Sequence, residues 1–186
     1  AVKPVLALKS GRTAGGQAAT ASHTGALAGV HAAFRAACKQ TGVQEVETVQ
    51  ALFDAALAFA YQPLPRGNRI ALLTNSGGPA ALAADALEGV GLQLARTSPE
   101  TQTRLRAIVH PDAQVTGPVD LLGGADAAGY RAALDVVLAD PACDGVLAIL
   151  VPQVLINPPA VVEAFGAAAT AQAGPPKPVL ACLMGE

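Results

Sequence analysis

The stretch GRTAGGQAATASHTGALAG, residues 11–29, follows a short apolar run and decides how we interpret the first part of the chain. It places His23 at the end of a run of small residues, just before an alanine-rich segment. A strand, a glycine-rich loop and a helix N-terminus together form an anion site, because unpaired backbone N–H groups and the positive end of the helix dipole meet there. We expect the loop to end at Ser22 as N-cap, and a helix over about residues 24–40 to stop at Gly42.

A histidine at such a helix end is expected to stay neutral and nucleophilic, since the positive end of the helix disfavours the protonated imidazole. Once phosphorylated, it would present negative charge to the same N–H groups, so His23 is a candidate phosphoryl carrier. The alternative is a ring that only caps backbone groups, and the chemistry alone does not choose between the two. Of the other histidines, His31 is interpreted as structural or exposed, and nothing around His110 suggests chemistry.

Composition excludes several classes of protein. Apolar residues make up 52% of the 186 residues and aromatic residues only 3%, which favours an aliphatic core between helices and a parallel sheet. The net charge of −2, with twelve scattered basic residues, argues against a nucleic-acid partner. The sequence has no apolar run near the roughly 20 residues of a membrane helix. The three cysteines (Cys38, Cys143, Cys182) are interpreted as buried thiols in a reducing compartment, so we expect a cytoplasmic protein without a metal site.

Apolar periodicity alternates between strands and helices along the whole chain. We expect strands at 2–8, 43–46, 70–74, 92–95, 145–151 and 178–182, and helices at 24–40, 48–60, 79–89, from 98, 125–138 and 159–171. The proline-rich segment 62–68 is typical of a linker, and the pentapeptide KPVLA occurs at both 3–7 and 177–181.

These observations predict an α/β protein of two related flavodoxin-like units with parallel sheets, residues 1–61 and 69–186, joined by the linker. The first unit has only two strands, too few for a free parallel sheet, and the second ends on a strand with no helix after it. We therefore expect the first unit to be incomplete, and the missing helix after the last strand indicates the same for the second. The chain is then a piece of a longer polypeptide.

A second strand–loop–helix junction follows the linker, in the segment TNSGGP at residues 74–79. Its candidate phosphate-binding residues are Asn75, Ser76, Gly77 and Gly78. Simple turn chemistry is the alternative, but two such junctions in one chain allow two helix ends to face one phosphate. Asp120, in the segment GPVD, is a candidate loop-structuring residue. The sequence has no Walker A motif, which argues against a nucleotide site within this chain. It has no nucleophile elbow, which argues against a hydrolase.

Four segments, taken together, resemble a known family. SGRT at 10–13, SHTGALAG at 22–29, LTNSGGP at 73–79 and GPVDL at 117–121 are similar, in the same order, to the nucleoside-diphosphate-forming acyl-CoA synthetases. That family includes ADP-forming acetate–CoA ligase and, more distantly, succinyl-CoA synthetase. The resemblance covers nearly the whole chain, and the histidine segment is its most specific part.

The resemblance implies an acid–thiol ligase that interconverts acyl-CoA, ADP and phosphate with a carboxylic acid, CoA and ATP, through an acyl phosphate and a phosphohistidine. His23 matches the phosphorylated residue, with Ser22, Thr24 and Gly25 around it, and residues 75–78 match the second helix end that holds the phosphoryl group. It also implies CoA, ATP or ADP, and Mg²⁺ as cofactors of the full enzyme, bound mostly outside this chain.

The implied partners are a CoA-binding Rossmann domain, an ATP-grasp domain or subunit, a small carboxylic acid and an oligomeric assembly. Neither partner domain matches any part of this sequence, nor does the upstream carboxylate that orients the histidine in relatives, so this piece alone is not expected to turn over. Two other functions stay open here: an acyl-CoA- or nucleotide-sensing module of a protein acetyltransferase, and a generic flavodoxin-like interaction domain. Retention of His23 favours the enzyme, since a sensor does not need the nucleophile.

Overall fold

The chain divides into two units, Ala1–Tyr61 and Gln62–Glu186, which are described separately. The computed structural model describes residues 3–24 and 30–185. Both units alternate strands with helices, and every strand pair within a sheet is parallel. The predicted fold class, α/β with parallel flavodoxin-like sheets, is confirmed.

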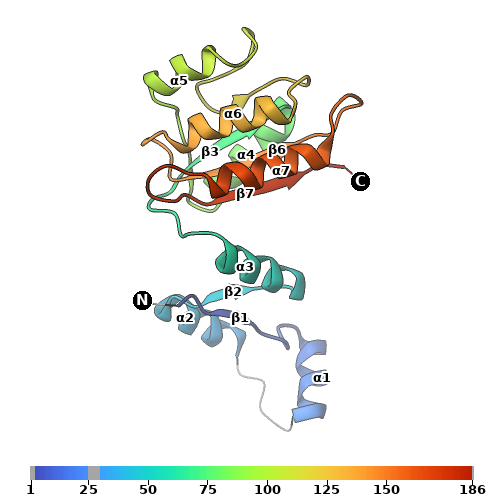
Figure 1. Ribbon diagram of the computed structural model, residues 1–186. Coiled ribbons are helices and arrows are strands. Elements are labelled where there is room, and N and C mark those ends of the chain that lie inside the picture. Colours follow the sequence, from blue (N-terminus) through green and yellow to red (C-terminus); the bar gives the residue numbers. More distant parts are fainter. Residues whose placement is uncertain (1–2, 25–29, 186) are drawn as a thin grey trace. The chain divides into compact units, whose positions relative to one another are not determined.

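In its described residues, the first unit has a two-stranded sheet and three helices (Figure 1, blue to cyan). In chain order its elements are β1 (Leu6–Leu8), α1 (Ala14–Thr24), α2 (His31–Thr41), β2 (Gln44–Val46) and α3 (Val49–Tyr61). The two strands pair from Leu6 with Gln44 to Leu8 with Val46. Among the described residues of this unit, Cys38 is the only buried apolar side chain, which agrees with a sheet too small to enclose a core.

Helix α1 contradicts the prediction of a loop up to Ser22 and a helix beginning near Thr24. The helix starts after Thr13, whose hydroxyl accepts a hydrogen bond from the N–H of Gly16 at 3.2 Å. Gly15 and Gly16 therefore fill the first helical turn, where N–H groups have no partner in the helix, and the alanine-rich residues that follow have high helix propensity. The interpretation of these glycines as loop residues is therefore wrong.

The other boundaries of the first unit follow from local signals that the sequence shows. Gly42 ends α2 with φ of 74°, a left-handed conformation that costs glycine little. The Thr48 hydroxyl accepts a hydrogen bond from the N–H of Ala51 at 3.0 Å, so it caps α3 as predicted.

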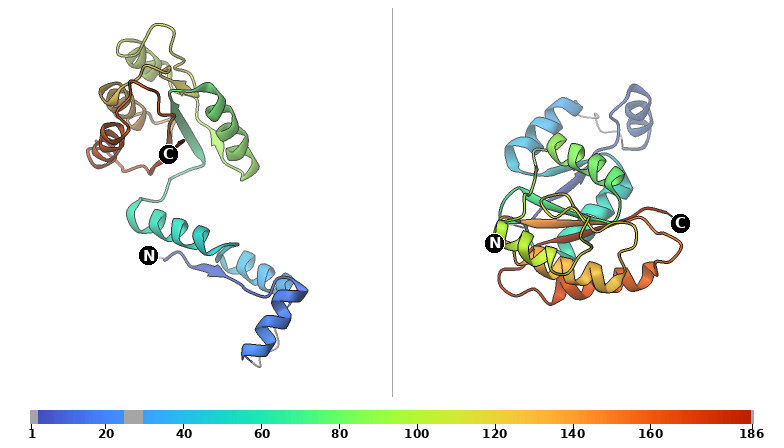
Figure 2. Two further views of the ribbon diagram at one scale, coloured as in Figure 1. Left: turned by 90° about the vertical axis from the view of Figure 1, so that its right-hand side faces the viewer. Right: turned by 90° about the horizontal axis from the view of Figure 1, so that it is seen from above.

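The second unit is a five-stranded parallel sheet with helices on both faces. Its elements are β3 (Arg69–Thr74), α4 (Gly77–Gly89), β4 (Gln93–Leu94), α5 (Pro99–Arg106), β5 (Val119–Asp120), α6 (Ala127–Leu138), β6 (Gly145–Leu150), α7 (Pro158–Thr170) and β7 (Val179–Leu183). The strand order is β4-β3-β6-β7, and β5 pairs with the end of β3. Helices α6 and α7 cover one face of this sheet, and α4 lies on the other face (Figure 2).

The core of the second unit lies between the sheet and the pair α6–α7. Alternate residues of each strand face it, so Leu73 of β3 and Ala148 of β6 are fully buried against Leu134 of α6. The rings of Tyr130 and Phe165 meet edge to face, with centroids 5.3 Å apart. Each fully buried aliphatic side chain contributes about 1.5–3 kcal/mol, so this layer holds the sheet in place.

Helix starts in this unit are set by side-chain caps. Ser98, Asp126 and Asn157 each accept a backbone N–H hydrogen bond from the first turn of α5, α6 and α7, respectively. One prediction fails here: Cys143 is buried, as is Cys38, but Cys182 is exposed. Cys182 lies on β7 at the sheet edge, where the chain buries only the first residue of the strand.

Candidate functional site

The predicted phosphoryl carrier, His23, lies in the first unit at the end of α1. Ser22, His23 and Thr24 form the last turn of that helix, and Gly25 lies outside the described residues. The expected position at a helix N-terminus is therefore wrong. The argument that a positive helix end keeps this imidazole neutral does not apply to this backbone, because the C-terminal end of a helix carries the opposite partial charge.

The predicted second junction is present at the end of β3. The Thr74 hydroxyl accepts the N–H of Ser76 at 3.0 Å and donates to the carbonyl of Ser76 at 3.1 Å, which closes a tight turn. Ser76 is the N-cap of α4 but its side chain makes no capping hydrogen bond. The turn therefore leads into α4, and the Ser76 side chain leaves the N–H groups of the first helical turn uncapped.

Asn75 has a role that the sequence does not reveal. Its side-chain NH₂ donates to the carbonyl of Val151 at 2.8 Å, and its side-chain oxygen accepts the N–H of Val151 at 2.9 Å. Asn75 is 2% exposed, so this amide clamps the end of β3 to the end of β6. Because the side chain is bound to Val151, we expect Asn75 to shape the junction rather than to contact phosphate through its side chain.

Gly77 and Gly78 form the first turn of α4. Apart from the neighbouring residues and backbone of its own helix, a methyl group on Gly78 would meet no atom within 4 Å, so the space beside this turn is open. A methyl group on Gly77 would stand 3.5 Å from Oδ2 of Asp120, an ordinary contact. The first turn of α4 thus has the two properties that an anion site needs: N–H groups at the positive end of a helix, and room for a ligand to reach them.

Asp120, the candidate loop-structuring residue, makes a hydrogen bond within the neighbouring loop. It ends β5 and is paired with Thr74 of β3, and its Oδ1 accepts the N–H of Leu122 at 2.9 Å. Leu122 has φ of 67°, a left-handed conformation that is unusual for a bulky residue and that the hydrogen bond to Asp120 holds. Burial raises the pKa of the Tyr130 hydroxyl, and the charge of Asp120 raises it further.

The carboxyl ends of β3, β5 and β6 therefore bring three loops to one edge of the sheet. Parallel α/β sheets bind ligands at this edge, because helix N-termini and variable loops meet there. A hollow of about 490 Å³ lies beside the β5–α6 loop, between Leu121 and His110. Sequence reasoning missed it, since His110 stands alone in a loop and its neighbours carry no motif.

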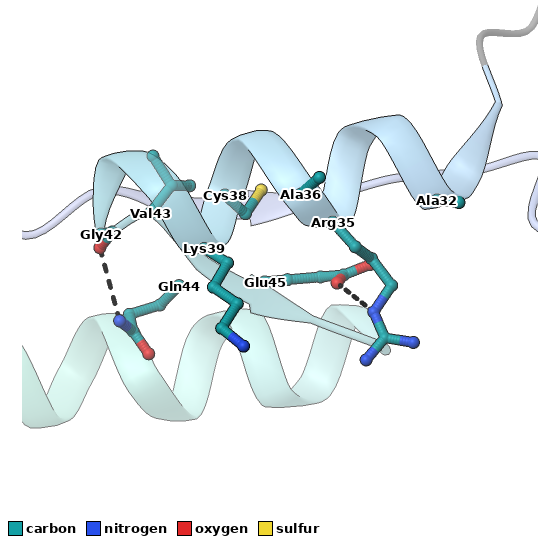
Figure 3. A pocket seen from close by; sticks show the side chains of 9 residues that line it. All are labelled: Ala32, Arg35, Ala36, Cys38, Lys39, Gly42, Val43, Gln44 and Glu45. Atoms are coloured by element: carbon teal, nitrogen blue, oxygen red, sulfur yellow. Dashed lines mark hydrogen bonds and ion pairs between the residues drawn. The ribbon is translucent and has the colours of Figure 1, made fainter.

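The first unit has a polar cluster that sequence reasoning also missed. His31 Nε2 lies 2.7 Å from Oε1 of Glu45, and Arg35 Nε lies 3.5 Å from Oε2 of the same carboxylate. This agrees with the structural role predicted for His31, since the contact ties α2 to β2. Beside it lies an open hollow of about 600 Å³ between α2 and β2, with Lys39 and Cys38 among its lining residues (Figure 3).

Within residues 3–24 and 30–185, the histidine, cysteine and carboxylate side chains form no group of three that could hold a metal ion. The same residues contain no helix of the length and apolar character that a membrane crossing needs.

Comparison with known proteins assigns both units. Residues 1–59 match the family described as the succinyl-CoA ligase-like flavodoxin domain, and residues 70–186 match the Ligase-CoA domain. The chain belongs to the Ligase-CoA family, within the nucleoside-diphosphate-forming acyl-CoA synthetases. The resemblance inferred from the four sequence segments is confirmed.

Curated relatives include ADP-forming acetate–CoA ligases. The chain is 44% identical over 149 residues to the alpha subunit of acetate–CoA ligase [ADP-forming] II of Pyrococcus furiosus, covering 80% of this chain and 32% of that protein. It is 41% identical to acetate–CoA ligase [ADP-forming] I of Archaeoglobus fulgidus over 151 residues, covering 81% of this chain and 22% of that protein. A 4-hydroxybutyrate–CoA ligase [ADP-forming] of Nitrosopumilus maritimus is 37% identical over 155 residues, covering 83% and 22%. The chain thus spans less than a third of the length of each of these three relatives.

A solved structure shares the fold. The dinucleotide forming acetyl-coenzyme A synthetase 1 of Ca. Korarchaeum cryptofilum, in complex with phosphate and ADP, matches with a TM-score of 0.85 and 29% identity. The match covers 98% of this chain and 39% of that one.

Proposed function

We propose that this chain is part of an ADP-forming acyl-CoA synthetase and carries its phosphohistidine. The enzyme would interconvert acyl-CoA, ADP and phosphate with a carboxylic acid, CoA and ATP. The observation that carries the proposal is the match of both units, in order, to domains of this synthetase family, with ADP-forming ligases among the relatives. None of the relatives named above is an acetyltransferase, so the sensor alternative has no comparable support.

His23 is the residue we assign as phosphoryl acceptor. An imidazole nitrogen attacks the phosphorus of an acyl phosphate, the bond from phosphorus to the acyl oxygen breaks, and the carboxylate leaves with the electron pair. The phosphoryl group then leaves the imidazole for the next acceptor, which restores the neutral ring. Ser22, Thr24 and Gly25 are assigned as its phosphate-binding neighbours on the sequence match alone.

The first turn of α4 is the second element we assign to phosphate. Support comes from the N–H groups of Gly77 and Gly78, the open space at Gly78, and a Ser76 side chain that does not cap the helix. Phosphate at such a helix end is stabilised by the dipole by about 0.3–1 kcal/mol per charge in exposed sites, and by more where water is excluded. Asn75 contributes by fixing the turn against Val151.

CoA supplies the thiol, the nucleotide supplies the final phosphoryl acceptor, and Mg²⁺ would neutralise the nucleotide's phosphate charge. On the family resemblance, we assign these three mostly to parts of the enzyme outside this chain. A CoA-binding Rossmann domain and an ATP-grasp domain or subunit are therefore the proposed partners, in an oligomeric, cytoplasmic enzyme that acts on a small carboxylic acid.

The proposal is tested by labelling the protein in its full natural length with γ-labelled ATP. We expect acid-labile, base-stable label that disappears in His23→Ala and persists in His110→Ala, a control that removes a histidine whose side chain is 61% exposed. Full labelling of His23→Ala, or no labelling of the wild type under turnover conditions, contradicts the proposal.

A further inference from the structure

The carboxylate of Asp120 stands directly beside the first turn of α4. Its Oδ2 lies 3.5 Å from the position that a Cβ of Gly77 would take, and its Oδ1 accepts the N–H of Leu122 at 2.9 Å. Two different strands impose this position, because Asp120 of β5 pairs with Thr74 of β3, which leads into α4. The strand pairing fixes the backbone of Asp120, and the hydrogen bond from the N–H of Leu122 holds its carboxylate in this position.

This negative charge has no cationic side-chain partner among the described residues. The ion pairs found there join other residues, and none includes Asp120. Asp120 is half-buried, so water screens its charge less than at the surface. Its favourable partners are the N–H of Leu122 and the positive end of α4.

A phosphoryl group bound at α4 would therefore share that helix end with a carboxylate. Like charges at such short range in a half-buried site repel each other, so binding of the anion is weaker than the helix end alone would give. An enzyme that passes a phosphoryl group onward gains from loose holding, because tight ground-state binding raises the barrier to the next transfer.

We propose that Asp120 is a positioning residue that weakens phosphate binding at the first turn of α4 and so keeps the phosphoryl group transferable. This rests on the proposed function, which assigns phosphate to that turn. The competing explanation is structural: Asp120 only holds Leu122 in its left-handed conformation.

The variant Asp120→Asn separates the two explanations. Asparagine keeps an oxygen that accepts the N–H of Leu122 and has nearly the same shape, but it removes the charge. If the charge matters, Asp120→Asn binds inorganic phosphate more tightly, by about tenfold at low ionic strength, and the gain shrinks as salt is added. The same variant has a slightly lower Tm, because a favourable charge at a helix N-terminus is lost. A damaged loop would instead weaken binding and lower Tm together.

The experiment is calorimetric titration of inorganic phosphate into the full-length wild type, Asp120→Asn and Asp126→Asn, with Tm measured for each. Asp126→Asn is the matched control, since it removes a carboxylate from the N-cap of α6, where asparagine caps equally well. Tighter binding in Asp120→Asn alone supports the inference. Equal or weaker binding in Asp120→Asn overturns it and leaves the proposed function standing. A wild type that binds no phosphate and accepts no label from ATP overturns both.

Discussion

Replacing Gly78 by alanine should stabilise the second unit and impair its function at the same time. Gly78 lies in the first turn of α4, does not need a positive φ, and has open space where a methyl group would go. Alanine is favoured over glycine in a helix by about 1 kcal/mol in the interior and by less in the first turn, so we expect a gain of about 0.5–1 kcal/mol in the free energy of unfolding. For a domain of this size that corresponds to a rise in Tm of about 2–5 °C.

Function should change in the opposite direction. The added methyl group fills the space through which a phosphate oxygen reaches the N–H groups, so we expect phosphoryl transfer to slow by about ten- to a hundredfold. Thermal unfolding by calorimetry measures the first effect, and the rate of phosphohistidine formation from labelled ATP measures the second. The matched control is Gly166→Ala in α7, where a methyl group also meets nothing within 4 Å; it should raise Tm and leave transfer unchanged. A Gly78→Ala protein that is more stable and fully active would refute the assignment of phosphate to α4.

Three further predictions concern the second unit. Asn75→Ala removes both hydrogen bonds to Val151 and leaves its buried backbone groups unpaired, so the free energy of unfolding should fall by about 2–4 kcal/mol, as measured by urea denaturation; a loss below about 0.5 kcal/mol would contradict the clamp. Tyr130→Phe removes a buried hydrogen bond from the hydroxyl to the carbonyl of Ile149 and should cost about 1–2 kcal/mol in the same assay, whereas an unchanged midpoint would argue against this bond. The hydrogen bond and ion pair with Arg69 lower the pKa of Asp144, so this carboxylate stabilises the fold above its unfolded pKa of about 3.9, and the contribution is lost as the pH falls through the lower folded pKa. The Tm of Asp144→Asn should therefore fall less steeply than that of the wild type below about pH 4. Parallel curves of Tm against pH would exclude this linkage.

The second unit was predictable because its boundaries carry explicit signals. Ser98 followed by Pro99 at α5 combines a capping hydroxyl with a proline at the first helical position, which is a specific pattern. The β6 strand (GVLAIL) is an apolar run of six residues, and the β3 strand (RIALLT) holds four apolar residues in a row, which is typical of buried parallel strands. Local chemistry and tertiary packing agree in this unit, so sequence reasoning found nearly every element.

The first unit was harder because glycine has two opposite uses. Gly15 and Gly16 resemble a phosphate loop, but after the cap of Thr13 they fill a first helical turn. Nothing in the spacing distinguishes the two cases, so α1 was missed and His23 was assigned to the wrong end of a helix.

The strand–helix junction of the candidate site was predictable from the sequence, but the contacts that its side chains make were not. The segment at residues 75–78 was identified correctly as a strand–helix junction. That Asn75 clamps Val151, and that Asp120 stands beside Gly77, depends on partners distant in the sequence. Such contacts arise only when parallel strands bring their carboxyl ends to one edge.

The central claim, that His23 is the phosphoryl carrier, is tested most directly by locating the phosphoryl group on the protein. Digestion with trypsin after labelling with ATP yields the peptide Thr13–Arg35, which contains both His23 and His31. Fragment-ion mass spectrometry under alkaline conditions then assigns the modified ring. We predict phosphate on His23 alone; phosphate on His31, or an unmodified peptide from protein that turns over, would contradict the claim.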